Sequence, residues 1–249
     1  MATGVKSILD CIGVGSGGEK SLLFDLFGFI RGRVPPDPTG VRSEVSLKRL
    51  INDLQTKHIH LNVIRVGMDT LSAGDQDEAL QNLDYAVYRI RDIYQQVSLG
   101  VGRVQHYFID ADEANGRDDI ANEDEAEALW DEWTVPGNAI DCFVVRNIDG
   151  FLGLSPVGGN CDKDGKGDGL LGGHYTRGFD GLSRTFAHEI GHFLDLSHNH
   201  DDGECPSTAS GRNNLMAQTG CVDDVRADVN LASSQGSDMR DHCSVKNGC

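Results

Sequence analysis

Long apolar runs are missing from this chain of 249 residues, and no internal repeat is apparent. No stretch approaches the roughly 20 consecutive apolar residues that a membrane-spanning helix requires. Hydrophobic residues still make up 39% of the chain, which is enough to build a sizeable core. The sequence therefore predicts a globular protein without a membrane span, folded as one large domain or two small ones.

Basic side chains are scarce. The chain has 22 Lys and Arg against 39 Asp and Glu, for a net charge of −17. Such a protein repels phosphate, so we exclude nucleic acid as a partner. The acid is concentrated between Asp110 and Glu132, where only Arg117 is basic. We interpret this stretch as a solvated acidic face, and the alternative is a recognition surface for cationic substrates.

Paired CxxC cysteines, the mark of a structural zinc or redox motif, are absent although the chain has seven cysteines. Seven are many for a reduced cytosolic enzyme, so we expect disulfides and a secreted, extracellular protein. The segment Met1 to Leu9 contains no apolar core of signal-peptide length. Either a signal precedes this sequence and is removed, or export takes another route.

Cys205 and Cys221 are the first pair that we expect to be bridged. Cys142 lies in the apolar run from Ile140 to Val145 and is predicted to be a buried free thiol. The remaining pairing alternatives join Cys243 to Cys249, or join one of these two to Cys161.

Three histidines and a glutamate stand at the spacing of a hydrolytic metal site. His188 and His192 are four residues apart and so lie on one face of a helix, where both can reach one zinc ion. His198 cannot share that face and must return after a sharp turn. Three nitrogen ligands would leave a fourth zinc position open for water, as in catalytic rather than structural sites.

Glu189 follows the first of these histidines directly. A carboxylate in this place can take a proton from the attacking water and return it to the leaving amine. The apolar residues Leu182, Phe186, Ile190 and Phe193 recur at helical spacing and predict a buried stripe that anchors the helix. The pattern predicts hydrolysis assisted by zinc.

The segment resembles the metzincin clan of zinc metallopeptidases, whose motif HExxHxxGxxH is matched at His188, Glu189, His192 and His198. The resemblance extends over roughly residues 58 to 198. It implies an α+β fold, with a mixed twisted sheet, a long backing helix, an active-site helix and a small C-terminal subdomain below the cleft.

One position departs from the clan motif. Asp195 replaces the glycine that lets the chain leave the helix at positive φ. Aspartate adopts this left-handed conformation more readily than most residues, so the turn is still expected. His200 and Asp195 itself are the alternative ligands to His198.

The resemblance implies two further features of the site. Met216 is expected in a methionine turn that packs under the histidines, and it would equally serve as core. Gly153, Leu154 and Ser155 are similar to the clan's edge strand, where an extended substrate can pair by strand addition.

Hydrophobic periodicity predicts the remaining elements. Helices are expected over Ser46 to Lys57, Glu78 to Val97, an acidic segment before Glu132, and Asn230 to Cys243; strands are expected over His58 to Val66, Val101 to Ile109 and Ala139 to Arg146.

The Pro-rich segment Arg33 to Gly40 marks a boundary. We interpret residues 1–40 as a leader or pro-like segment and residues 41–249 as the catalytic domain. Within that domain, the upper subdomain would cover about 41–198 and the lower about 199–249.

A calcium site is a separate hypothesis. Asp162, Asp164 and Asp168 lie on a Gly-rich loop and could supply oxygen ligands, although the loop lacks the full EF-hand pattern. A simple polar turn explains the same residues equally well.

The sequence thus predicts a monomeric zinc-dependent endopeptidase that acts on polypeptides, with Glu189 as general base and acid. One alternative is a zinc amidase acting on cell-wall peptides. Another is a non-catalytic zinc-binding effector, which would have no need of Glu189 beside its first ligand.

Overall fold

A computed structural model describes residues 55–163, 169–201, 204–225 and 228–248 of the protein. Its central element is a five-stranded sheet of β1 (Lys57–Val66), β2 (Gly100–Ile109), β4 (Ile140–Val145), β6 (Gly169–His174) and β7 (Lys246–Asn247). The order β2-β1-β4-β6 is parallel throughout, and β7 pairs antiparallel with the start of β1. The sheet is mixed, as predicted.

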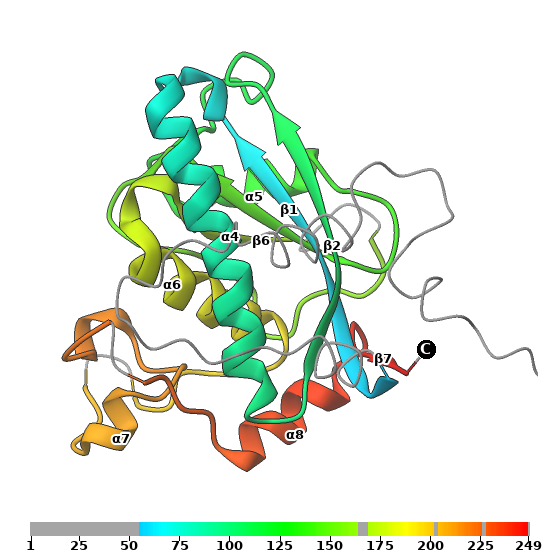
Figure 1. Ribbon diagram of the computed structural model, residues 1–249, viewed down its shortest axis with the longest axis vertical. Helices are drawn as coiled ribbons and strands as arrows, with labels where there is room; N and C mark the ends of the chain where they lie inside the picture. Colours follow the sequence, from blue (N-terminus) through cyan, green and yellow to red (C-terminus); the bar gives the residue numbers. More distant parts are fainter. Residues whose placement is uncertain (1–54, 164–168, 202–203, 226–227, 249) are drawn as a thin grey trace, which may run out of the picture.

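Helices cover both faces of this sheet (Figure 1). Strand β4 shows how: Cys142 and Val144 face the core formed with α4 (Ala73–Gln95) and α6 (Gly178–Phe193), whereas the alternate residues face the core formed with α5 (Glu123–Glu132). A parallel strand covered on both faces is apolar at nearly all consecutive positions, and Asp141 is the charged exception in β4. All six residues of β4 are buried.

Helix α4 is the long backing helix that the periodicity predicts. It begins five residues before the predicted start, because the Ser72 side chain caps the helix by accepting a hydrogen bond from the Asp75 amide. The predicted stripe is buried from Leu83 to Val97. Leu80 is the exception, at 37% exposure, because it lies beyond the edge of the covered face.

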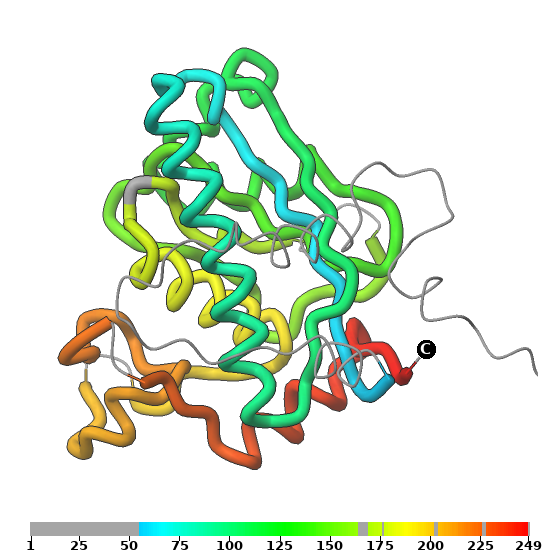
Figure 2. Tube along the Cα trace, in the orientation of Figure 1, coloured from blue at the N-terminus to red at the C-terminus, as the bar shows by residue number. Residues whose placement is uncertain are grey.

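The C-terminal segment forms a layer below the end of α6, coloured orange to red in Figure 2. It contains the short helix α7 (Ala209–Arg212) and α8 (Ser233–Asp241). The Cys205–Cys221 disulfide closes a loop within this layer, and Cys161–Cys243 ties the layer to the segment that follows β5. Cys142 is a buried free thiol. The Cys205–Cys221 bridge and the free thiol of Cys142 are as predicted. Of the alternatives for the second bridge, the structure contains the one between Cys161 and Cys243.

Small elements complete the described chain: η1 (Met68–Thr70), β3 (Asp119–Ile120), β5 (Asn147–Ile148), η2 (Tyr175–Arg177) and η3 (Thr219–Cys221). Strands β3 and β5 form a separate two-stranded sheet. Within the described part of the chain, no helix has the length and apolar character needed to cross a membrane.

Three sequence predictions of elements need correction. Strand β6 was not predicted, because three of its six residues are glycines, which have low strand propensity. The helix predicted to end at Lys57 does not reach that residue, which opens β1. The C-terminal helix is shorter than predicted and ends at Asp241, where His242 turns to an extended conformation.

Two other predictions fall on residues outside the described ranges. The leader or pro-like segment 1–40 lies there, as do Asp164 and Asp168 of the calcium hypothesis. Asp162 is exposed, and the neighbouring Lys163 ammonium lies 2.5 Å from a carboxylate oxygen of buried Asp141.

Candidate active site

His188, His192 and His198 come together at the end of α6. One ligand nitrogen from each lies within 4.8 Å of the others. Helix α6 places the first two one turn apart, and the chain then reverses at Asp195, whose φ is 73°. The predicted left-handed turn is therefore present, and it returns His198 to the helix end.

Backbone carbonyls orient the first two imidazoles. His188 Nδ1 lies 2.7 Å from the Leu215 oxygen, and His192 Nδ1 lies 2.6 Å from the Leu196 oxygen. A carbonyl can only accept, so each Nδ1 must carry the proton. Each Nε2 then presents a lone pair to the space between the three rings, as a metal ligand requires.

The spacing of the nitrogens fits a zinc ion. His192 Nε2 and His198 Nε2 are 3.2 Å apart. Ligands about 2.05 Å from a tetrahedral zinc are separated by about 3.3 Å. If both nitrogens carry lone pairs, a cation between them would stabilise this close approach. The donor set, three imidazole nitrogens, is one that zinc prefers.

Burial keeps these histidines neutral. It lowers the pKa of His188 to about 3 and that of His192 to about 4, with the neighbouring imidazoles adding to the effect. Burial also raises the pKa of Glu189, which is only 6% exposed, to about 8. The site is therefore a pocket of low polarity in which charge is costly without a bound cation.

Met216 lies beneath the ligands. It is fully buried, and its sulfur would lie 2.7 Å from a Cβ placed on Gly191, between the two helical histidines. The buried Arg184 guanidinium, one turn before His188, donates to the Asn214 oxygen over 2.8 Å. The next carbonyl, that of Leu215, is the acceptor for His188. Arg184 thus holds the methionine turn against α6.

A short segment covers the opposite side of Glu189. Leu154 pairs antiparallel with Leu171 through two backbone hydrogen bonds of 3.0 and 2.8 Å. The predicted edge strand is therefore a single bridge rather than a full strand. A Cβ on Gly153 would lie 2.7 Å from Glu189 Cγ and 2.8 Å from the Leu171 oxygen. Only glycine fits at this position.

The segment after the bridge caps the end of the active-site helix. Gly158 and Gly159 donate backbone hydrogen bonds of 3.0 and 2.9 Å to the carbonyls of His192 and Phe193. These carbonyls belong to the last turn of α6, which has no intrahelical donors for them. The cap links the edge segment to the helix that carries the ligands.

The alternative ligands have other contacts. His200 Nε2 accepts from the Gln218 amide, and its Nδ1 lies near the Asp201 oxygen. Asp195 is exposed and its carboxylate lies against Gly158. Among the described residues, the other metal-capable group is Cys161, His242 and Cys243, whose sulfurs form a disulfide.

The sequence gives no signal for the backbone acceptors of the site. The carbonyls of Leu196 and Leu215 orient two ligands, and any residue type carries a carbonyl. Arg184 had a partial signal, because a charged residue falls one turn before His188 on the same helix face.

Comparison with known proteins supports this geometry. Residues 80–199 match the Reprolysin-like metallo-peptidase family M12B, a range that includes all three histidines and Glu189. The match supports a metallopeptidase of the metzincin clan.

The fold is also similar to that of a solved protein. Its structure is similar to that of mature mirolysin from Tannerella forsythia in complex with a cleaved peptide, at 14% identity and a TM-score of 0.50. The match covers 74% of this chain and 90% of mirolysin.

Metalloproteinase-II from Bacteroides fragilis matches at 15% identity and a TM-score of 0.44, over 77% of this chain and 54% of that one. No curated protein matches the sequence of the metallopeptidase. The family match supports a zinc-dependent endopeptidase that hydrolyses polypeptides.

Proposed function

We propose that His188, His192 and His198 hold the catalytic zinc and that Glu189 is the general base and acid of peptide hydrolysis. The observation that carries the proposal is the convergence of one ligand nitrogen from each histidine, with the Nδ1 atoms of His188 and His192 already in contact with carbonyls. When bound, zinc would polarise the scissile carbonyl and lower the pKa of the attacking water.

Glu189 has the position for proton transfer. It is adjacent to His188 in the sequence, is buried, and lies directly under Gly153. Its carboxylate would take the proton of the attacking water and deliver it to the leaving amine. Burial excludes bulk water from the carboxylate, so the proton would pass between Glu189 and the substrate.

The edge segment Gly153, Leu154 and Ser155 would hold the substrate backbone. Leu154 already pairs with Leu171 on one side. An extended polypeptide could pair on its other side, and main-chain hydrogen bonds would then fix the scissile bond over Glu189. This binding mode requires an extended chain and explains why the substrate is a polypeptide.

The test compares zinc content and casein cleavage in the wild type, Glu189→Gln and a matched control, Glu127→Gln, on the exposed surface of α5. We expect one zinc in all three proteins, cleavage by the wild type and the control, and loss of cleavage in Glu189→Gln. Loss of a general base typically costs about 10²–10⁴-fold in rate. Full activity of Glu189→Gln would rule out its role.

We also propose that the protein works in an oxidising, extracellular compartment. Two disulfides among the described cysteines support this location. Secretion can be tested by fractionating the producing culture and assaying both fractions for the protein. Finding it only inside reducing cells, with the four cysteines as thiols, would contradict the proposal.

A further inference from the structure

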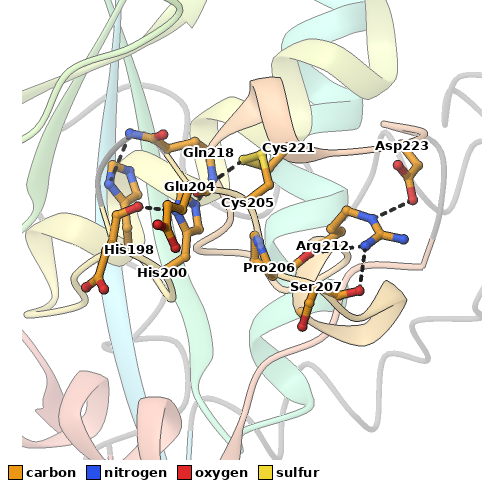
Figure 3. The surroundings of a disulfide bond; sticks show 12 residues. His198, His200, Glu204, Cys205, Pro206, Ser207, Arg212, Gln218, Cys221 and Asp223 are labelled. Atoms are coloured by element: carbon orange, nitrogen blue, oxygen red, sulfur yellow. Dashed lines mark hydrogen bonds and ion pairs between the residues drawn. A yellow bond between two sulfur atoms is a disulfide. The ribbon is translucent and has the colours of Figure 1, made fainter.

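The third histidine differs from the other two in what lies against its Nδ1. The first two meet backbone carbonyls. His198 Nδ1 instead lies 3.5 Å from Nε2 of the Gln218 side-chain amide, two residues after Met216 (Figure 3). The residue type at position 218 determines this contact, whereas a backbone carbonyl is present whatever the residue type.

Two backbone contacts bring Gln218 to this position. The Asn199 amide donates to the Met216 oxygen over 3.1 Å, which aligns the segment after His198 with the methionine turn. The Gln218 amide donates to His200 Nε2, also over 3.1 Å. The His200 ring is stacked on His198, with centroids 5.7 Å apart and an interplanar angle of 11°.

The geometry of His200 agrees with its role as acceptor. Its Nδ1 lies 3.1 Å from the Asp201 oxygen, and because that oxygen can only accept, Nδ1 carries the proton. Nε2 is then free to accept from Gln218. The Cys205–Cys221 disulfide closes the loop that contains the methionine turn and ends three residues after Gln218 (Figure 3). Gln218 is therefore held by its backbone on both sides.

We infer that Gln218 is a positioning residue for the third zinc ligand, with its amide oxygen accepting the proton of His198 Nδ1. A half-turn of the amide brings Oε1 to the place that faces Nδ1. His198 Nε2 would then present its lone pair, as the other two ligands do. If the amide nitrogen of Gln218 faced His198 instead, Nδ1 would accept its hydrogen. The proton of the imidazole would then be on Nε2, where it blocks the metal.

This inference rests on the proposed ligation of zinc by His198 and adds a residue that the clan motif does not contain. It also concerns the ligand that returns through the Asp195 turn, outside the helix that holds the other two. Mutating a residue that hydrogen-bonds a metal-bound histidine typically weakens metal affinity about 10–100-fold.

The experiment measures zinc affinity by competition with a chromogenic chelator, together with the thermal midpoint of the zinc-free protein. Gln218→Met keeps the length of the side chain but removes the acceptor, and Gln218→Glu keeps an acceptor. Both retain the backbone bond to His200. The matched control is Gln96→Met, because the Gln96 side chain donates to the Val229 oxygen far from the ligands.

We expect Gln218→Met to weaken zinc binding about 10–100-fold while the zinc-free midpoint stays unchanged. Gln218→Glu and Gln96→Met should bind zinc nearly as the wild type does. Wild-type affinity in Gln218→Met would overturn the inference, and so would equal weakening in Gln218→Glu. If the wild type itself binds no zinc, the proposed function fails, which is a different outcome.

Discussion

At the scale of single residues, Gly153 lies so close to Glu189 that it leaves no room for a side chain. A Cβ on residue 153 would lie 2.8 Å from Glu189 Oε1 and equally near the Leu171 backbone oxygen. Either the carboxylate or the edge segment must move to make room. The position therefore couples the proposed substrate-binding segment to the proposed general base.

Gly153→Ala should lower kcat/KM by about 10²-fold, because a displacement near 1 Å at reacting groups costs that much. Zinc content should be unchanged, since the atoms nearest to the added Cβ belong to Glu189 and Leu171 rather than to the three histidines. Gly74→Ala is the control, because no atom lies within 4 Å of its added Cβ. Peptide-cleavage kinetics check the prediction, and wild-type kinetics in Gly153→Ala would contradict it.

Asp195 occupies the turn that brings His198 back to the site, at φ 73°. Glycine adopts this conformation without strain, whereas a β-branched residue does not. We expect Asp195→Gly to keep zinc and similar activity, and Asp195→Val to lose about 1–3 kcal/mol of stability. Chemical denaturation and zinc analysis measure both. Complete inactivity of a zinc-loaded Asp195→Gly would show that the carboxylate has a role beyond turning the chain.

At the scale of elements, a fully buried hydrogen bond joins α4 to α6 inside the core. The buried Tyr94 hydroxyl donates to the Ala187 oxygen over 2.7 Å, immediately before the first ligand. Tyr94→Phe removes this donor and preserves the ring. We expect a loss of about 1 kcal/mol in urea denaturation, with zinc binding retained. No change in stability would mean that water replaces the hydroxyl at Ala187.

At the scale of the whole molecule, the start of the sheet contains a pair of buried histidines. The His58 and His60 rings are 5.0 Å apart on β1, and the cations Arg103 and Lys246 face them. Burial and these cations lower the pKa of His60 to about 3. The Arg103 amide donates to His60 Nδ1, which requires that this nitrogen be unprotonated.

Acid should therefore destabilise the fold. The unfolded chain takes up a proton at His60 near the ordinary histidine pKa of 6.5, and the folded protein does so only near 3. The contribution of His60 is present above pH 6.5 and is lost as the pH falls toward 3. The slope is at most about 1.4 kcal/mol per pH unit.

The measurement is urea denaturation between pH 7 and pH 4 of the wild type and His60→Gln. Glutamine can still accept from Arg103 but does not titrate, so the variant should lose stability less steeply as the pH falls. Parallel curves for the two proteins would show that His60 does not contribute to the acid sensitivity.

The elements were predictable where the pattern is local. Repetition of Leu83, Val87, Ile90 and Tyr94 is a property of one segment, and α4 follows from it. Strand β6 was not predictable from the sequence, because it contains Gly169, Gly172 and Gly173. These glycines fit the close packing of neighbouring segments and have low strand propensity. A Cβ on Gly172 would meet the Phe186 ring at 2.6 Å, a contact between segments that only the packed fold creates.

The sequence alone determined that His188 and His192 share a helix face with Glu189 beside them, and that the chain must turn at Asp195, since helix geometry and backbone conformation depend on near neighbours. Only the tertiary structure decided which atoms lie against the three imidazoles: the Leu215 and Leu196 oxygens and the side-chain amide of Gln218. The contacts of Leu215 and Gln218 join residues far apart in the chain, and backbone groups that every residue shares carry no signature until folding brings them together.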